Sequence, residues 1–574
     1  MKALQSVRAW APVAVMAAAL IALCAAVVAL PAFPVDETRY LTVAWEMRTT
    51  GSWILPTLNF EPYSHKPPLL FWLINAGWSL FGVAVWPARL AGALSMVCVL
   101  LSVNSLDRRL APGAEPGQPA ASVLMLLSLP LFVTLGFSIM FDMLLTATVS
   151  AAMLALWIAG RSGARSAFVL YGICIGLGVL AKGPVALLFT LPAALLARHW
   201  ADPAVRRGWI LRIALALSLG LGLALAWALS AAYLGGHDYA EMLFWKQSAG
   251  RVTSSFAHAR PFWFYVPIIV LYFVPLLLWR PVWAGLRQRF GANSEAFVFL
   301  TCWIVPGFAA LSLVSGKQLH YLLPLVPAVA LLASLGLRGA ALGLSTADRL
   351  PLLILVGLAS CGLAAVILAP SWLIPNNSSL VFVISQLKLP LVLLVGALVM
   401  GALTLVGRSL EASLMGLAAA NLIFLSGLAL QSRTAIGQLF DLQPVADIVQ
   451  EFGKRPIAVA QETRGEFGFL ARLKRPVQHV PEDRIACWLA AHPDGIAIVR
   501  TRIRAEGAKR DSGSTTALLE RKYRDAEMIS VLAHKSALIA PGQFPDTCTT
   551  KNYEENEGRR AEHGAMFSGA GVFK

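Results

Sequence analysis

Residues 209–234, WILRIALALSLGLGLALAWALSAAYL, decide the class of this protein. The run contains a single charged residue, Arg212, and as a helix it is long enough to cross a bilayer, which takes about 20 apolar residues. Similar apolar runs lie on both sides of it, at 10–31, 84–104, 120–140, 142–160, 167–181, 184–198, 262–280, 295–314, 320–338, 350–370, 389–407 and 412–431. The sequence therefore predicts an α-helical polytopic membrane protein with about 13 transmembrane helices.

Charge is distributed unevenly along the chain. Of the 574 residues 57% are hydrophobic and only 14% are charged, whereas soluble domains carry about 25% charged residues. Residues 1–432 contain 13 acidic residues, and the much shorter segment 433–574 contains 18. We therefore expect a membrane domain over 1–432 and a water-exposed domain over 433–574. The net charge of +16 does not indicate nucleic-acid binding, because most of the excess lies in short loops between apolar runs.

The basic residues occupy alternate loops, which predicts the orientation of the chain. Cytoplasmic loops of membrane proteins are enriched in Lys and Arg. One alternating set of loops carries Lys2 and Arg8, Arg108 and Arg109, Arg161 and Arg165, Arg198, Arg206, Arg207 and Arg212, Arg280, Arg287 and Arg289, Arg338 and Arg349, and Arg408. We therefore expect a cytoplasmic N-terminus, and the odd number of spans places the C-terminal domain outside.

The segment after the last span has the pattern of a small α/β domain. Strand-like runs lie at 456–460, 496–500 and 528–541, with helical stretches at 441–452 and 483–491. From residue 551 the chain is polar and Gly-rich, which predicts disorder. Cys487 and Cys548 have no metal-ligand spacing around them. A disulfide between them and two free thiols are both open.

The longest predicted outer loop, 32–83, is unusual in its semi-polar character. Residues 37–50 are expected to form an amphipathic helix that Asp36 caps and Gly51 ends. Its apolar side, which we expect to lie along the membrane surface, carries Tyr40, Val43, Ala44 and Met47.

Two pairs of ionisable residues in this loop allow two interpretations each. Asp36 and Glu37 have the positions of a helix cap and a first-turn acid, but a capped carboxylate is also well oriented for chemistry. Lys66 begins an apolar run, where it either extends to the headgroups or binds a phosphate. His65 is a candidate proton carrier or metal ligand, although a lone histidine is weak support for either.

Further ionisable residues lie in other outward turns, where basic residues are normally scarce. They are Asp142 after the third span, Lys182 and Lys317 in two short turns, and Arg251 and Arg260 in the loop 235–261. Charged groups at membrane depth are costly, so each needs a functional or structural reason. Because the topology places them on one face with Asp36 and Lys66, we predict a polar site there.

The chain resembles the protein-mannosyltransferase-like membrane glycosyltransferases, and in particular the aminoarabinose transferases that modify lipid A. The resemblance rests on DETRY at 36–40, WEM at 45–47, GSWILP at 51–56 and KPPLLFWL at 66–73. Shorter matches follow in order, FD at 141–142, KGP at 182–184, GK at 316–317 and YLLP at 321–324. The resemblance covers most of residues 1–335 and implies the GT-C fold in a bacterial inner membrane, with the outer face periplasmic.

The resemblance also implies roles for residues. Asp36 would be the carboxylate nearest the reaction and Asp142 a second acid, both as catalytic groups. The phosphate of an undecaprenyl-linked sugar donor would be bound by Arg39, Lys66, Tyr321 and an arginine of the later loop, Arg251 or Arg260. Glu37, His65, Lys182 and Lys317 are further candidates for lining the site.

The substrates remain open at this point. The implied donor sugar is 4-amino-4-deoxy-L-arabinose or a hexosamine, and the implied acceptor is a lipid A phosphate, with a periplasmic glycan or protein hydroxyl as the alternative. Many relatives have Glu where this chain has His65, so a metal is not assigned, although histidine also binds zinc. No cofactor is predicted with certainty, and a divalent cation is left open. The rival class is a lipid-linked sugar transporter. Many transporters are built from internal repeats, and we find no such repeat in this sequence, which argues against that class.

Overall fold

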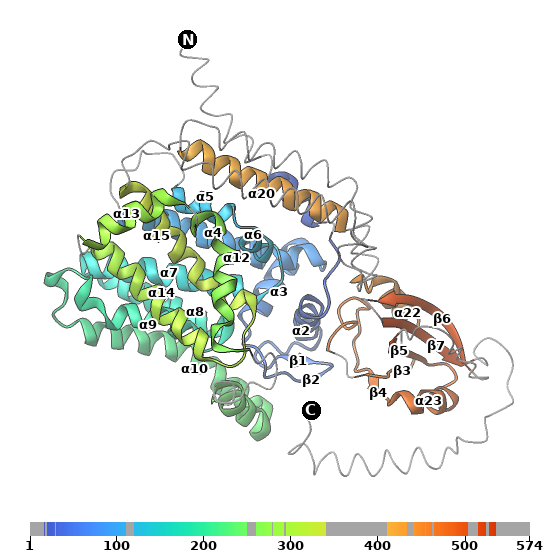
Figure 1. Ribbon diagram of the computed structural model, residues 1–574. Coiled ribbons are helices and arrows are strands. Elements are labelled where there is room, and N and C mark those ends of the chain that lie inside the picture. The colour runs from blue at the N-terminus through green and yellow to red at the C-terminus, as the bar shows by residue number, and fades with distance from the viewer. Residues whose placement is uncertain are drawn as a thin grey trace.

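In the computed structural model, helices dominate the N-terminal part of the chain and a mixed sheet the C-terminal part (Figure 1). The structure describes residues 20–110, 120–249, 260–339, 410–432, 440–502, 515–523 and 527–534, apart from seven single positions within them. Arg251, the predicted spans 350–370 and 389–407, the loop 371–388, Cys548 and the segment from 551 lie outside the described residues.

Within this part of the chain seven helices are long and apolar enough to cross a membrane. They are α4 (Val85–Leu110), α7 (Phe141–Ser162), α8 (Arg165–Lys182), α10 (Trp209–Glu241, continued by the π-helix η3, Met242–Ala249), α14 (Glu295–Leu313), η5 (Leu319–Leu325) with α15 (Val326–Gly339), and α20 (Leu410–Ser432). The class of polytopic membrane protein is thus confirmed. The number thirteen stays a prediction.

The run 120–140, which was predicted as one span, is broken into two short helices. These are α5 (Ala121–Leu127) and α6 (Pro130–Gly136). Pro130 lacks a backbone N–H and disfavours the helical conformation of the residue before it, and Leu129 is accordingly extended. The run 184–198 forms only the short helix α9 (Val185–Leu195), followed by the 3-10 turns η1 (Ala197–His199) and η2 (Pro203–Val205).

The bundle is built around α7. In an apolar 18-residue stretch of α7, 83% of the residues are buried inside the protein, whereas the corresponding share for α10 is 28%. Helix α7 is therefore central and α10 peripheral. Helices α8 and α10 approach very closely, because a Cβ on Gly172 or Gly220 would overlap the backbone of the opposite helix. Small residues at such crossings are typical of membrane helix packing. The remaining elements of this part are η4 (Phe262–Phe264), α12 (Tyr265–Leu277) and α13 (Arg280–Gly291).

The tail contains a five-stranded sheet in the order β4-β3-β5-β7-β6. The strands are β3 (Ile457–Val459), β4 (Gln478–His479), β5 (Ile496–Arg502), β6 (Thr515–Tyr523) and β7 (Glu527–His534). β3 runs parallel to β4 and β5, and the other pairs are antiparallel. The predicted segment 456–460 contains β3, and the segments 496–500 and 528–541 overlap β5 and β7, whereas β4 and β6 were not predicted.

The two faces of the sheet have different apolar partners, as the alternation of side chains along a strand requires. Ala458, Ala497 and Val499 pack with α23 (Ile485–Ala491), which follows the turn η6 (Glu482–Arg484). Ile457, Val459, Ile496 and Ile498 belong to a second core, with the apolar side of α22 (Gln443–Glu451) and with residues of the first loop. The sheet and the first loop thus share one core.

The first loop forms α2 (Asp36–Thr50), a hairpin of β1 (Thr57–Leu58) and β2 (Glu61–Pro62), and α3 (Leu69–Phe81), which lie between the bundle and the sheet (Figure 1). Gly51 ends α2 in the left-handed conformation, as predicted (φ 74°). Two expectations were wrong. Asp36 is the first helical residue and makes no capping bond, and the apolar side of α2 is buried by protein, with Val43, Ala44 and Met47 fully inaccessible.

Candidate functional site

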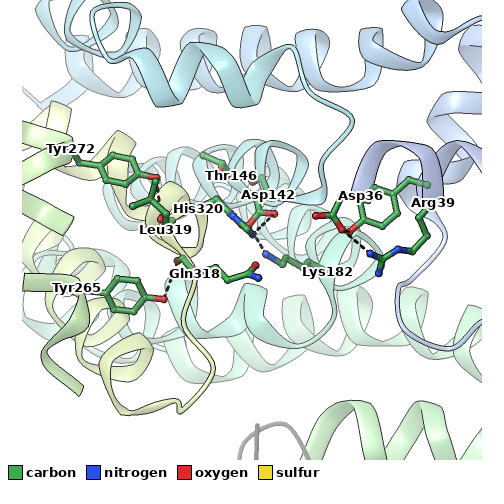
Figure 2. A network of polar contacts seen from close by, with 11 residues as sticks. Asp36, Arg39, Asp142, Thr146, Lys182, Tyr265, Tyr272, Gln318, Leu319 and His320 are labelled. Carbon is green, nitrogen blue, oxygen red and sulfur yellow. Dashed lines mark hydrogen bonds and ion pairs between the residues drawn. The ribbon is translucent and has the colours of Figure 1, made fainter. Parts of the chain in front are cut away.

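A buried carboxylate lies at the start of the central helix. Asp142, in the first turn of α7, is only 3% exposed. Its Oδ1 is 2.5 Å from Nζ of Lys182, the last residue of α8, and its Oδ2 is 3.7 Å from Nε2 of His320 in η5 (Figure 2). The consecutive helices α7 and α8 and the distant element η5 therefore bring one acid and two basic side chains together at one end of the bundle.

Two further predicted residues reach the same place. The Lys66 ammonium lies 5.4 Å from the ring centroid of Phe141, the neighbour of Asp142. The Lys182 ammonium lies 4.5 Å from the ring centroid of Tyr321. Lys66 precedes α3 and Tyr321 is part of η5. The structure thus joins Lys66, Lys182 and Tyr321 around Asp142, as the one-face topology predicted.

Asp36 and Arg39 form a second, more accessible pair on α2. Arg39 NH2 is 3.2 Å from Asp36 Oδ1, and the Tyr40 hydroxyl donates to the same oxygen at 3.4 Å. The Asp36 side chain is 51% exposed, in contrast to Asp142. Figure 2 shows the Asp36 carboxylate directed toward the Lys182 side of the network, and its charge acts on His320.

The charge on Arg39 is fixed. Burial lowers the pKa of its guanidinium, but Tyr63, Tyr40 and Asp36 raise it, and the net result is a pKa above the ordinary value. Arg39 therefore stays cationic at every physiological pH, and it keeps a positive charge beside Asp36.

Two tyrosines that the sequence reasoning missed hold the turn before His320. Tyr265 OH donates to the carbonyl of Gln318 at 3.3 Å, and Tyr272 OH donates to that of Leu319 at 3.1 Å (Figure 2). Both belong to α12. Their spacing of seven residues places them on one helical face, and this was the available signal.

Lys317 and Arg260 tie two loops together. The Lys317 ammonium is 3% exposed and donates to the carbonyls of Arg260, at 3.1 Å, and Val314. The Arg260 amide in turn donates to Ser315 O at 3.1 Å. Burial lowers the pKa of Lys317. These contacts are with backbone, so they shape the turn that carries His320 and Tyr321.

Glu37 is engaged in a structural network. Its carboxylate accepts hydrogen bonds from Phe33 N at 2.9 Å, Ile139 N at 3.0 Å and Arg89 NH2 at 2.8 Å. Arg89 also donates to the carbonyls of Leu30 and Pro31. This buried pair joins the end of the first span to α4 and to the loop before α7. A single Arg inside the apolar run 84–104 was the sequence signal for it.

His65 differs from the lysine that follows it. Its ring is exposed and stacks on Tyr63, with ring centroids 5.3 Å apart and an interplanar angle of 12°. Among the residues that the structure describes, no group of three or more His, Cys, Asp or Glu side chains is arranged to hold a metal ion. His65 thus has no cluster of metal-ligating side chains around it in the described part of the chain, and no metal is assigned.

Fold and site together define a membrane protein with a cationic site at one end of its helix bundle. Residues 65–233 match the family model of dolichyl-phosphate-mannose-protein mannosyltransferases. The chain has the fold of ArnT from Cupriavidus metallidurans, with a TM-score of 0.72 and 19% identity over 94% of this chain and 100% of that one. A second structure of the same protein, bound to undecaprenyl phosphate, gives the same TM-score at 20% identity over 92% and 99%.

Two curated relatives carry a more specific name, undecaprenyl phosphate-alpha-4-amino-4-deoxy-L-arabinose arabinosyl transferase. The protein from Sodalis glossinidius is 32% identical over 59% of this chain, and the one from Pseudomonas aeruginosa strain UCBPP-PA14 is 32% identical over 58%. The matched segments cover 61% and 60% of the lengths of these relatives. The predicted resemblance is confirmed: residues 65–233 match the mannosyltransferase family model, the named relatives are aminoarabinose transferases, and the fold is that of ArnT.

Proposed function

We propose that the protein is an inverting glycosyltransferase that moves 4-amino-4-deoxy-L-arabinose, or a related amino sugar, from undecaprenyl phosphate to a phosphate of lipid A. The observation that carries the proposal is the convergence of Lys66, Lys182 and Tyr321 on one buried carboxylate at one end of the bundle. The names of the relatives indicate the donor, and lipid A follows from the family that the chain resembles.

The reaction breaks the bond between the sugar C1 and an oxygen of the carrier phosphate. C1 then bonds to an oxygen of the acceptor, through an oxocarbenium-like transition state. The carrier leaves as undecaprenyl phosphate with one more negative charge. Lys66 and Arg39 are positioned cations that stabilise this developing charge, and Tyr321 is a hydroxyl donor beside them. Their preorganisation is the main contribution of the protein to the rate.

The two carboxylates have different roles. Asp142 is bonded to Lys182 and near His320, so it orients these two side chains and does not act as a free base. Asp36 is accessible and lies beside Arg39. A lipid A phosphate is already ionised near neutral pH and needs no general base, so Asp36 stabilises the positive charge that develops on the sugar. A hydroxyl acceptor would instead need Asp36 as the base.

The proposal includes the topology. The site lies in the periplasm, the N-terminus is cytoplasmic, the 13 spans occupy residues 1–432, and residues 433–574 form a periplasmic α/β domain. The ends of the helices support this division, since α7 has Asp142 in its first turn and Arg161 in its last, and α8 begins at Arg165 and ends at Lys182. Cys487 is disulfide-bonded, which supports an oxidising compartment for the tail.

Mass spectrometry of lipid A from cells with and without the gene tests this function. We expect an aminopentose-sized addition on a lipid A phosphate that disappears on deletion. In membranes containing Lys66→Ala, transfer should fall about 100-fold while the protein level is unchanged. Arg207→Ala, which removes an exposed basic residue from the turn before α10, is the control and should transfer normally. Unchanged lipid A in expressing cells, with a modified periplasmic glycan or protein, would reassign the acceptor.

A further inference from the structure

A short segment of the tail packs against α2, the helix that carries Asp36. We call residues 465–477, between β3 and β4, the tail clasp. Thr42, on the second turn of α2 and 1% exposed, connects to it twice. Its hydroxyl donates to Gly465 O at 2.7 Å and accepts a hydrogen bond from Phe469 N at 3.0 Å. The Thr42 side chain therefore holds the backbone of the clasp against α2.

The remaining contacts of the clasp extend along the first loop. Trp45 Nε1, also on α2, donates to Leu473 O at 2.7 Å. Asn59 in the hairpin turn exchanges two hydrogen bonds with the backbone of Val477, at 2.9 and 3.2 Å. The clasp is thus bonded to both α2 and the hairpin.

Aromatic and cationic packing completes the interface. Phe469 stacks on Trp78 of α3, with ring centroids 5.1 Å apart and an interplanar angle of 5°. The Arg472 guanidinium lies over Trp45, 5.2 Å from the ring centroid, and its NH2 donates to Val83 O at 3.0 Å. Helix α2, the hairpin turn and helix α3 are therefore all in contact with one tail segment of 13 residues.

Two glycines permit this close approach. A Cβ on Gly465, which has φ +82°, would lie 3.1 Å from Cα of Arg39. A Cβ on Gly468 would overlap the methyl group of Thr42. The backbone of the clasp therefore lies directly against α2 at the level of Arg39, the ion-pair partner of Asp36. No side chain can be added on that surface without moving the helix.

We infer that the tail clasp is a positioning element of the site, which fixes the placement of Asp36 and Arg39 relative to Lys66 and Lys182. Glu37 anchors the first turn of α2 to the bundle through Arg89. Among the described residues, Asp36 bonds to Arg39 and Tyr40 of its own helix, so its direction follows the orientation of α2. Two anchors, Glu37 in the first turn and the clasp contacts in the middle of the helix, define that orientation.

The inference rests on the proposed transfer reaction, and it predicts which kinetic parameter will change. Lys66 and Tyr321 do not belong to α2, so these two carrier-binding groups should keep their places when the clasp is displaced, whereas Arg39 moves with the helix. A misplacement of reacting groups by about 1 Å can cost about 100-fold in rate. The clasp should therefore lower kcat by more than it lowers the affinity for undecaprenyl phosphate.

The test is Gly468→Ala in the full-length protein in nanodiscs. We expect kcat to fall about 10- to 100-fold, the affinity for undecaprenyl phosphate to fall by less than this, and hydrogen exchange to become faster in residues 36–50 but not in α7. Adding Thr42→Ser removes the methyl group that the new Cβ meets and keeps the hydroxyl, so most of the lost turnover should return. Gly222→Ala in α10 is the control, because a Cβ on this glycine would meet nothing within 4 Å.

The outcomes separate this inference from the function on which it rests. Normal turnover and normal exchange in Gly468→Ala would overturn the role of the clasp. So would a loss of turnover that Thr42→Ser does not relieve, because the damage would then lie elsewhere in the tail. If the wild-type protein transfers no sugar, the proposed function fails, and the exchange of residues 36–50 still decides whether the clasp orders α2.

Discussion

A double-mutant cycle on the buried ion pair of Asp142 and Lys182 measures the coupling free energy between the two side chains. The Asp142 and Lys182 side chains are 4% and 14% exposed, with 2.5 Å between Oδ1 and Nζ. Asp142→Asn leaves the Lys182 ammonium buried without a counter-charge, and such a break costs about 3–5 kcal/mol. Lys182→Met leaves a buried carboxylate, but Lys66 and His320 also act on it, so its cost should be smaller.

The double variant removes both charges and should recover part of the stability. We expect a coupling free energy of about 1–3 kcal/mol from the cycle, read from thermal unfolding of the four proteins in the same detergent. Transfer should remain lost in all three variants, since the double variant restores packing but not the cation next to Tyr321. A coupling near zero, or a double variant that transfers normally, would refute the view that this pair organises the site.

Three other predictions concern the frame of the site. Glu37→Gln should destabilise the protein by about 3–5 kcal/mol in thermal unfolding, because it leaves Arg89 buried and uncompensated, and unchanged stability would contradict the structural role. Gly172→Leu should cost about 1–3 kcal/mol or more by separating α8 from α10, whereas Gly222→Leu, whose Cβ has nothing within 4 Å, should be tolerated. Burial raises the pKa of Glu46 despite three hydrogen bonds. A raised folded-state pKa means that its stabilising contribution is largest below about pH 4 and is lost as pH rises through that pKa. The stability of the wild type relative to Glu46→Gln should therefore decrease with rising pH over that range.

The long helices were predictable because hydrophobic length is a local property of the chain. The runs that became α4, α7 and α8 needed only counting. The run 120–140 was mispredicted for a local reason too, since Pro130 interrupts it and deserved more weight than the mean apolarity. Strands β4 and β6 were not predicted because neither has a clear apolar alternation. β4 has only two residues, and β6 is rich in charged residues.

The site was predictable in its members and not in its contacts. Topology places outward turns on one face, and this sufficed to group Asp142, Lys182 and Lys66. Which partner each side chain chooses depends on distances of a few ångströms between helices, which no local pattern records. Glu37 illustrates the limit. It is adjacent to Asp36 in sequence, but the helical rotation of about 100° per residue sends it to Arg89.

The balance of charge at the site explains why a carboxylate is built into a phosphate-binding cluster. Interactions that are equally strong in the ground state and the transition state do not raise turnover, and they slow release of the carrier. Asp142 offsets the charge of Lys182, so the cluster around the phosphate is less cationic than its number of basic residues indicates. In the proposed reaction, Lys66 is a cation of the same cluster, and its attraction for the carrier grows as the carrier gains charge. Among the described residues, Asp36 is exposed and contacts Arg39 and Tyr40 of its own helix, so it is suited to the opposite end of the breaking bond, where positive charge develops on the sugar. The buried acid and the exposed acid would thus serve opposite partial charges of one transition state.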